Sequence, residues 1–451
     1  MLSRPKDGRI ILVENETTLR TNVIHTSTTH SDSRPCLTTR RGFGGFGRIA
    51  TAIVLALIII YTPQASAQKI FKPIRVALKA KKPADALKEV QKLEATCPTA
   101  LRPKLLDYGM QACIRLNEGL NEKIYLKQAY DTVQFFRTIY DIFDYALRCD
   151  TAERALLAET GKPMHYQKPH AQTLRKYYRN LVAGGRFYFT RARYGEAIPF
   201  LCYALDVPRS ALWSHEGRKL RRTTYVYNAV MLVRSAFMTH NYALARQYAD
   251  IALEDTTAAR RSMLAYLARS AQMMDDTEAY LDYLKTGLKE YPAEPFFFTE
   301  LVDFHADRNE YDATLALAEK MLQSDSTNYY FLMAKGLSLM NMKKDLESVE
   351  YFKKAVVADS THNDTYYYLG TALCNVARSV EVPANLNSAA YKSALARQRE
   401  YYKEARSPLE TYRALQPSDA KRWAPQLYDV YFALNLGEQF AEMDEIVKTL
   451  R

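Results

Sequence analysis

The sequence predicts an all-α protein built as one long array of helix pairs, and three observations support this. Apolar residues make up 48% and charged residues 25% of the 451 residues, which are the proportions of a globular chain. Only 16 residues are Gly and 17 are Pro, well below the roughly 12% of average usage, which argues against a turn-rich all-β fold or a disordered chain. Pro292, Ser326 and Ser360 follow one another at intervals of 34 residues, as do Gly336 and Gly370. A fixed period of this length is typical of a repeat array, so one solenoid can replace the several domains that the length alone would suggest.

The first 67 residues are predicted to be an N-terminal leader that carries a secretory signal peptide. An uncharged apolar run covers residues 49–61, with Arg40, Arg41 and Arg48 before it and a small-x-small site at 65–67 after it. These features are typical of a signal peptide, and the run is shorter than the roughly 20 apolar residues of a spanning helix. We therefore expect cleavage near Ala67 and an exported protein, in the periplasm or associated with the outer membrane. An uncleaved anchor is the alternative, and residues 39–43 also match a twin-arginine export motif.

Residues 68–177 are predicted to form an irregular N-terminal helical region. Two helix-pair units begin near residues 66 and 101, and Ala86 and Pro98 support the first. The interval from 101 to the next unit exceeds one period, and helical patterns at 124–158 fill part of the excess. Breaks in the helices are expected at 161–163 and 168–170, where Gly and Pro interrupt the pattern.

Residues 178–376 are predicted to form a regular array, with units that begin near residues 178, 226, 261, 295, 329 and 363. In the clearest unit, Gly185 and Ala197 are expected where two helices cross closely, because a larger side chain would push the helices apart. Leu181 and Tyr188 are expected to fill the space between neighbouring helices, because one pair cannot bury its apolar face alone. The predicted structural positions of the array are Leu181, Gly185, Tyr188, Ala197, Ala204, Ala245, Ala252, Gly336 and Gly370.

The C-terminal part of the chain departs once more from the period. Residues 377–399 are predicted to be an insertion loop, because the interval between the units at 363 and 420 is too long and contains Val382-Pro383-Ala384-Asn385. Residues 400–451 are predicted to form C-terminal helices, in which Leu427, Tyr431 and Leu436 belong to a pair that caps the array.

The spacing of these positions resembles the tetratricopeptide repeat (TPR), in which two antiparallel helices of about 34 residues stack on their neighbours. The resemblance implies a right-handed superhelical α-solenoid of about eight or nine helix pairs. The chain is similar to exported TPR proteins of Gram-negative, Bacteroidota-type bacteria.

No catalytic or metal-binding motif is present in the sequence. Patterns of the H-E-x-x-H, G-x-S-x-G and P-loop kinds and metal-spaced Cys/His pairs are all missing, so we predict neither an enzyme, nor a cofactor, nor a metal site. His165 and His170 lie close together in sequence and are interpreted as solvated loop residues. The widely spaced cysteines after the leader are interpreted as small buried apolar residues rather than as disulfide partners.

Positive charge is concentrated in one segment. Four units of the formal charge of +12 lie in the leader, and residues 175–222 carry eleven basic and three acidic residues, so they account for the remaining +8. Because the rest of the chain is neutral and an exported protein rarely meets nucleic acid, no nucleic-acid partner is predicted. A positively charged groove for an anionic ligand is one interpretation of this segment, and solvated or salt-bridged arginines are the other.

The resemblance to TPR proteins also implies a binding face, because the first helix of each pair lines the concave groove in that family. Arg186, Arg234 and Arg269 occupy the same position in three consecutive units, which implies a row of guanidinium groups along the groove. Arg presents a planar fork suited to carboxylates or phosphates. The predicted partner-binding residues are Arg179, Arg186, Tyr227, Arg234, Arg269, Tyr330 and Tyr367.

The predicted function is therefore a non-enzymatic scaffold of the cell envelope. We expect it to hold a protein or peptide partner that offers acidic side chains or a C-terminal carboxylate. The alternative is an accessory protein that binds an envelope glycan or lipopolysaccharide during polysaccharide export or outer-membrane assembly, in association with the membrane surface.

Overall fold

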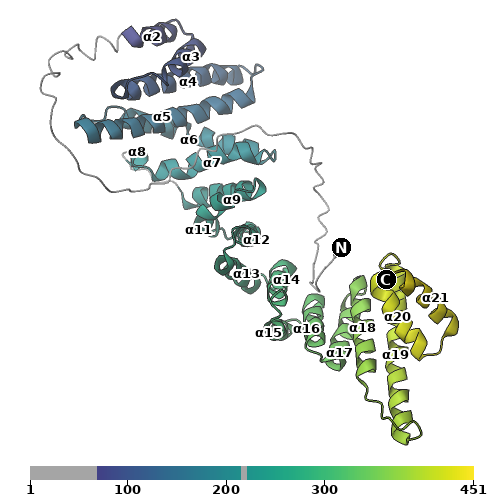
Figure 1. The fold of residues 1–451 in the computed structure, drawn as a ribbon. Coiled ribbons are helices and arrows are strands. Elements are labelled where there is room, and N and C mark those ends of the chain that lie inside the picture. The colour runs from purple at the N-terminus through teal and green to yellow at the C-terminus, as the bar shows by residue number, and fades with distance from the viewer. Residues whose placement is uncertain (1–68, 215–220, 451) are drawn as a thin grey trace, which may run out of the picture. The chain divides into compact units, whose positions relative to one another are not determined.

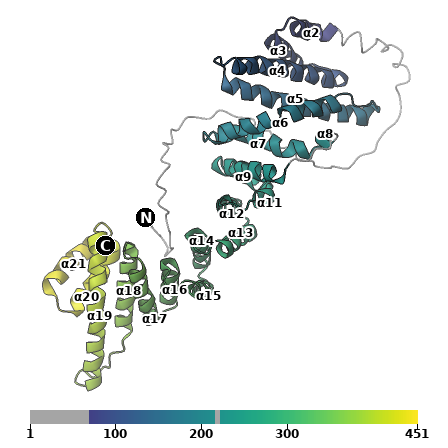
Figure 2. The ribbon, with the colours of Figure 1, turned by 180° about the vertical axis from the view of Figure 1, so that it is seen from behind.

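The computed structural model describes residues 69–214 and 221–450 (Figures 1 and 2). Within these two ranges it contains twenty α-helices, two short 3-10 helices and no β-strand, so the prediction of an all-α fold is confirmed. Helices adjacent in sequence pack against each other along the chain, which makes the protein an α-solenoid. Of the helices in these ranges, none is both long and apolar enough to cross a membrane. The predicted leader and its cleavage site lie outside the described residues.

The described helices form two bodies, residues 69–280 and residues 281–450, and the boundary lies within α13 (Thr277–Glu290). The N-terminal body contains α2 (Lys72–Lys79), α3 (Pro83–Leu93), α4 (Arg102–Tyr125), α5 (Thr132–Thr160), α6 (Gln167–Phe189), α7 (Tyr194–Asp206), α8 (Ala211–Ser214), α9 (Arg222–Met238), α10 (Tyr242–Gln247), α11 (Ala249–Ala252) and α12 (Ala259–Gln272). The 3-10 helices Thr99–Leu101 and Val207–Arg209 also belong to this body.

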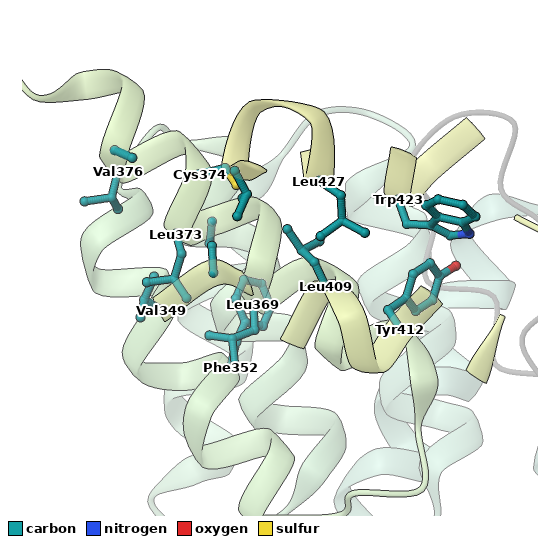
Figure 3. Packing of buried hydrophobic residues seen from close by; sticks show 14 of the residues in the cluster. Val349, Phe352, Leu369, Leu373, Cys374, Val376, Leu409, Tyr412, Trp423 and Leu427 are labelled. Atoms are coloured by element: carbon teal, nitrogen blue, oxygen red, sulfur yellow. The ribbon is translucent and has the colours of Figure 1, made fainter. Parts of the chain in front are cut away.

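The C-terminal body contains α14 (Pro295–Ala306), α15 (Tyr311–Leu322), α16 (Tyr329–Asn341), α17 (Asp345–Ala358), α18 (Asn363–Ser379), α19 (Ala389–Leu415), α20 (Ala420–Ala433) and α21 (Gly437–Thr449). Its core is continuous from one helix pair to the next. Figure 3 shows Phe352 of α17, Leu373 of α18, Leu409 of α19 and Leu427 of α20 in one cluster of buried side chains. Each pair therefore buries its apolar face on its neighbour, as expected for a repeat array.

The predicted insertion loop at 377–399 is wrong for most of its length. Helix α18 continues to Ser379 and α19 begins at Ala389, so only residues 380–388 lie outside helices. Ser388 caps α19, because its Oγ accepts a hydrogen bond from the backbone N–H of Tyr391 at 3.0 Å. The residues that follow are mostly Ala, Lys, Arg, Gln and Glu, which favour helices even without a repeat pattern.

The two predicted breaks before the regular array have different outcomes. Gly161 ends α5 in the left-handed conformation (φ 70°), which confirms the break at 161–163. The break at 168–170 is wrong, because α6 already begins at Gln167. Pro169 stands in the first turn of α6, where a backbone N–H would have no partner within the helix, so the proline does not interrupt it.

Close helix crossings occur at small residues. A Cβ atom on Gly185 of α6 would lie 3.0 Å from Cδ2 of Leu201 on α7, and one on Gly370 of α18 would lie 2.4 Å from Cγ of Leu409 on α19. Glycine lets these helices approach more closely than any side chain would permit. The remaining sequence-predicted structural positions are buried, namely Leu181, Tyr188, Ala197, Ala204, Ala245, Ala252 and Gly336.

Candidate functional site

Three consecutive first helices of the N-terminal body carry the predicted arginine row. Helix α9 contacts both α6 and α12, so the helices that bear Arg186, Arg234 and Arg269 lie next to one another. Two of these helices repeat the same local sequence, Arg234-Ser235-Ala236 in α9 and Arg269-Ser270-Ala271 in α12. In both, the buried serine Oγ donates a hydrogen bond of 2.7 Å to the carbonyl four residues earlier. Because the helices are locally equivalent, the arginines project from equivalent points.

The arginines of the row differ in their surroundings. Arg186 is exposed, and its side chain has no hydrogen-bond or ion-pair partner among the described residues. Arg234 is half-buried, with its guanidinium 5.6 Å from the ring centroid of Phe189 and its buried Nε without a hydrogen-bond partner in the same residues. Arg269 is also half-buried, and its Nη1 donates to Oε1 of Gln272 at 3.0 Å. Arg186 and Arg234 therefore lie on neighbouring helices and have no carboxylate partner in the described chain. Arg269, on the next first helix, is hydrogen-bonded to Gln272 at the end of its own helix.

Two further predicted binding residues lie on the same helices. Arg179 of α6 is exposed, seven residues and therefore about two helical turns before Arg186. Tyr227 of α9 stands in the same relation to Arg234, and 47% of its side chain is exposed. An aromatic ring and a cation thus share one face of α9, and two cations share one face of α6.

Most of the basic segment 175–222 serves the fold. Six of its basic side chains lie over aromatic rings or pair with carboxylates of the chain, and these are Arg175 on Trp213, Lys176 on Tyr177, Arg191 on Phe187, Arg193 on Tyr188 and Glu196, Arg209 on Tyr225, and Arg222 with Glu254. The hydrogen bond from Arg222 lowers the pKa of Glu254. Arg218 and Lys219 lie outside the described residues. The second interpretation of the segment was solvated or salt-bridged arginines, and the salt bridges are present for Arg193 and Arg222. Arg179, Arg186 and Arg221 are exposed and have no side-chain partner in the described chain.

The other predicted aromatic residues belong to the C-terminal body and are packed there. The guanidinium of Arg422 lies over the ring of Tyr367 of α18, 3.9 Å from the ring centroid. The ring centroids of Tyr367 and Tyr412 are 5.4 Å apart. Tyr330 of α16 is half-buried beside Tyr329, with ring centroids 5.4 Å apart. Tyr367 therefore has a structural role. Tyr330 and Tyr367 belong to the C-terminal body, whereas the row of Arg186, Arg234 and Arg269 belongs to the N-terminal body.

Arg422 is the centre of a cluster of charged and aromatic side chains that the sequence pattern did not predict. Its Nη1 lies 2.5 Å from Oδ1 of Asp364 and 2.9 Å from the hydroxyl of Tyr412. Burial by itself would lower the pKa of the guanidinium, but the negative charge of Asp364 helps to raise it above its ordinary value. Since α18, α19 and α20 each contribute one of these residues, Arg422 joins three helices. The arrangement is a structural brace, because all its charges are paired.

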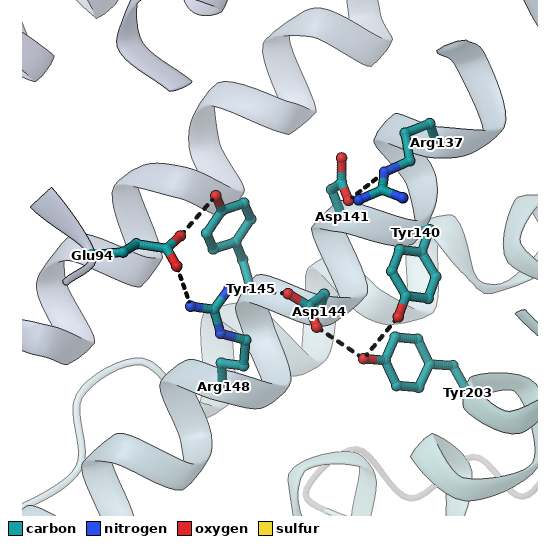
Figure 4. A network of polar contacts seen from close by, with 8 residues as sticks. All are labelled: Glu94, Arg137, Tyr140, Asp141, Asp144, Tyr145, Arg148 and Tyr203. Atoms are coloured by element: carbon teal, nitrogen blue, oxygen red, sulfur yellow. Dashed lines mark hydrogen bonds and ion pairs between the residues drawn. The ribbon is translucent and has the colours of Figure 1, made fainter. Parts of the chain in front are cut away.

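A second polar network joins Glu94, the residue that follows α3, to α5 and α7 of the N-terminal body (Figure 4). Glu94 accepts hydrogen bonds from the Tyr145 hydroxyl at 3.1 Å and from Nη2 of Arg148 at 2.5 Å. Asp144 accepts one from Arg148 at 3.1 Å and one from the Tyr203 hydroxyl at 3.0 Å. Burial raises the pKa of Tyr145 and of Tyr203. The spacing of Asp144 and Arg148 was the only signal in the sequence, since residues four apart meet on a helix.

The prediction that His170 is a solvated loop residue is wrong. It lies in α6 with 1% of its surface exposed, and its Nε2 is 3.0 Å from Oδ1 of Asp107 on α4. Helices α4 and α6 both pack against α5, so the contact between His170 and Asp107 connects the first helices of two neighbouring pairs. Within the described ranges, no group of three or more His, Cys, Asp or Glu residues is arranged to hold a metal ion.

Comparison with known proteins gives matches among solved structures alone. No family model and no curated protein matches the chain. The C-terminal part of a TPR repeat-containing protein from Cytophaga hutchinsonii is 10% identical, with a TM-score of 0.39 over 60% of this chain and 95% of that one. The TPR domain of P58(IPK) is 12% identical, with a TM-score of 0.27 over 86% and 99% of the two chains. The TPR2AB domain of yeast Sti1, in its complex with pHSP90, is 11% identical, with a TM-score of 0.22 over 57% and 98%. Likeness at this level assigns no partner, and the helix-pair solenoid of this chain is established by its own packing.

Proposed function

We propose that the protein is a non-enzymatic repeat scaffold that holds a protein or peptide segment against the first helices α6, α9 and α12. One observation carries this proposal. Arg186 and Arg234 are equivalent residues of neighbouring helices and have no carboxylate partner in the described chain, whereas Arg193 and Arg222 nearby pair with Glu196 and Glu254. Guanidinium groups that no carboxylate of the described chain neutralises are suited to bind the carboxylates of another chain.

The partner that fits this face is an acidic segment with apolar side chains. Arg179, Arg186 and Arg234 would contact its carboxylates, and the half-exposed ring of Tyr227 and the ring of Phe189 would contact its apolar groups. We place the protein in the cell envelope on the basis of the leader, with cleavage near Ala67.

The test compares two double variants that remove the same charge. Arg186→Gln/Arg234→Gln removes the two groups without a carboxylate partner in the described chain, and Arg193→Gln/Arg222→Gln removes two that pair with Glu196 and Glu254. The probes are peptides of one sequence in acidic and amidated forms, each with a free or amidated C-terminus. We expect the first variant to bind the acidic peptide about 10- to 100-fold more weakly, as for the loss of one charge-assisted hydrogen bond, and the second variant to bind it like the wild type.

Three results would contradict the proposal. Equal loss in both variants would mean that net charge alone attracts the peptide. Equal binding of acidic and amidated peptides would remove the role of carboxylates. Binding of a phosphorylated glycan, but of no peptide, would favour the envelope-glycan function over the peptide scaffold.

A further inference from the structure

The first helix pair of the described chain, α2 and α3, carries a second concentration of positive charge. Residues 69–93 contain eight basic and two acidic residues, a net charge of +6, which acidic residues elsewhere offset when the chain outside 175–222 is summed. The two concentrations differ in kind. Nine of the eleven basic residues at 175–222 are Arg, whereas seven of the eight here are Lys, at positions 69, 72, 79, 81, 82, 88 and 92.

Packing determines which face of α2 is exposed. Phe71, Ile74 and Leu78 are buried, with 1%, 0% and 5% of their surface exposed. Nη1 of Arg115 on α4 donates a hydrogen bond to the carbonyl oxygen of Leu78, and α3 packs against both α2 and α4. Because these contacts fix one face of α2 against the array, its opposite face is turned outward.

The outward face of α2 combines lysines with one apolar side chain. Lys72, Val76 and Lys79 are spaced by four and three residues, so they share this face, and 57% of Val76 is exposed. Further exposed lysines lie beside them in the chain, namely Lys69 before α2, Lys81 and Lys82 between the two helices, and Lys88 on α3. We call these six lysines and Val76 the lysine surface.

The carboxylates of the chain leave the lysine surface positive. Glu89 pairs with Lys92, with 2.6 Å between Oε1 and Nζ, and Glu94, the residue after α3, pairs with Arg148. Asp85 is exposed in the first turn of α3, where a negative charge stabilises the start of the helix. The second half of α4 contributes two charges of each sign, namely Arg115, Glu118, Glu122 and Lys123. Within the described residues, none of the six lysines pairs with a carboxylate.

The residue types of this surface fit an anionic bilayer better than a protein, a glycan or a nucleic acid. Lys offers a hydrated point charge on a flexible stem, without the planar fork by which Arg fits a carboxylate. Phe71 is the one aromatic residue of 69–93 and is buried, so this segment offers no ring on which a sugar or a base could stack. Val76 lies between Lys72 and Lys79 and can enter the boundary between headgroups and acyl chains while the lysine stems reach lipid phosphates.

We infer that the lysine surface binds a bilayer rich in anionic lipid and so holds the N-terminal body at the membrane by charge. About four to eight basic residues on an amphipathic helix suffice for such binding, because each adds to the attraction while it lies within a Debye length of the headgroups. The arginine face on α6, α9 and α12 is a separate site for a separate partner, so the two proposals stand independently.

Tryptophan fluorescence tests this inference in the full chain. The chain has two tryptophans, Trp213 and Trp423, and both are buried, with 6% and 4% exposed. Val76→Trp places a reporter at the centre of the lysine surface, and Val357→Trp is its control, because Val357 is exposed on α17 of the C-terminal body. The probe is a vesicle of phosphatidylcholine and phosphatidylglycerol with brominated acyl chains, which quench tryptophan on contact.

Two quadruple variants in the Val76→Trp background then separate this surface from net charge. Lys72→Gln/Lys79→Gln/Lys81→Gln/Lys82→Gln removes four charges from it, and Lys320→Gln/Lys343→Gln/Lys344→Gln/Lys421→Gln removes four exposed lysines of the C-terminal body. We expect the vesicles to quench Val76→Trp but not Val357→Trp. The first quadruple variant should weaken the binding that causes quenching at least about 100-fold, since each lysine near an anionic bilayer contributes roughly fivefold, and the second should leave it unchanged. The leader is common to all variants, so the lysine substitutions do not alter any tether that it provides.

Three outcomes would overturn the inference. Quenching that persists without the four lysines, or in vesicles of phosphatidylcholine alone, would show that a tether or an apolar contact holds α2 at the bilayer. Equal loss in the two quadruple variants would mean that net charge alone attracts the vesicle. Binding of soluble polyphosphate through the four lysines, without quenching by vesicles, would assign the surface to an anionic polymer. Circular dichroism of each variant confirms that its helices are intact.

Discussion

One helix of this protein offers the same substitution in two opposite environments. Helix α4 contains Gly109, which is buried, and Gly119, which is exposed. A Cβ atom on Gly109 would lie 2.5 Å from Cε1 and 2.7 Å from Cδ1 of Tyr145 on α5, whereas a Cβ on Gly119 would have no neighbour within 4 Å. We expect Gly109→Ala to destabilise the protein and Gly119→Ala to stabilise it.

The magnitude follows from two contributions. Replacing Gly by Ala inside a helix raises the free energy of unfolding by about 1 kcal/mol, and this gain is common to both variants. Crowding a packed core lowers it by about 1–3 kcal/mol, and this loss applies to Gly109 alone. Tyr145 cannot move aside easily, because it is 5% exposed and its hydroxyl donates to Glu94. The two variants should therefore differ by roughly 2 kcal/mol, with Gly119→Ala above the wild type.

Urea unfolding followed by circular dichroism measures both variants against the wild type. Because repeat arrays can unfold in steps, hydrogen exchange of the α4 and α5 amides should accompany it and report the N-terminal body separately. The reasoning about the crossing would be refuted if Gly109→Ala stabilised the protein as much as Gly119→Ala does.

Further predictions concern buried polar groups of both bodies. Arg422→Leu should destabilise the C-terminal body by about 1–3 kcal/mol, because it strands the carboxylate of Asp364, and Arg422→Lys should restore only part of the loss in urea melts. Burial raises the pKa of Asp206 above its ordinary 3.8 although Tyr248 donates to it. The folded state therefore favours the protonated carboxyl, so this contribution to stability is full below pH 3.8 and is lost as the pH rises through the raised pKa. Asp206→Asn should remove that part of the pH dependence of the free energy of unfolding. If stability depended on pH in the same way in the variant and the wild type, this role of Asp206 would be contradicted. Burial also raises the pKa of the Cys374 thiol to about 12, so a thiol reagent at neutral pH should modify it only after urea unfolds the C-terminal body, and rapid reaction of the native protein would show that the site is open.

The fold was predictable because its rules are local and repeated. The period of 34 residues placed Gly185 and Gly370 at helix crossings, and the burial of Ala197 and Ala204 follows from the same spacing. The loop predicted at 377–399 shows the limit of this reasoning. A period identifies where a repeat is missing, but helix-forming residues and the Ser388 cap decide whether the inserted chain is helical.

The candidate site was predictable only in part. The sequence placed Arg186, Arg234 and Arg269 at equivalent positions, and repeated packing of the helices preserves that equivalence. It could not show that Arg269 is tied to Gln272, or that Tyr367 lies beneath Arg422, because those contacts depend on which side chains meet across or along a folded helix.

The sequence by itself thus determined the class of fold, the register of its helix pairs and the segment where positive charge gathers, since composition and period suffice for these. Only the tertiary structure decided which charges remain for a partner. Arg193 and Arg222 of the 175–222 segment pair with Glu196 and Glu254, while Arg186 and Arg234 have no carboxylate partner in the described chain. A charge is engaged or left available according to its neighbours in space, and those neighbours come from residues such as Glu254 that are distant in the chain.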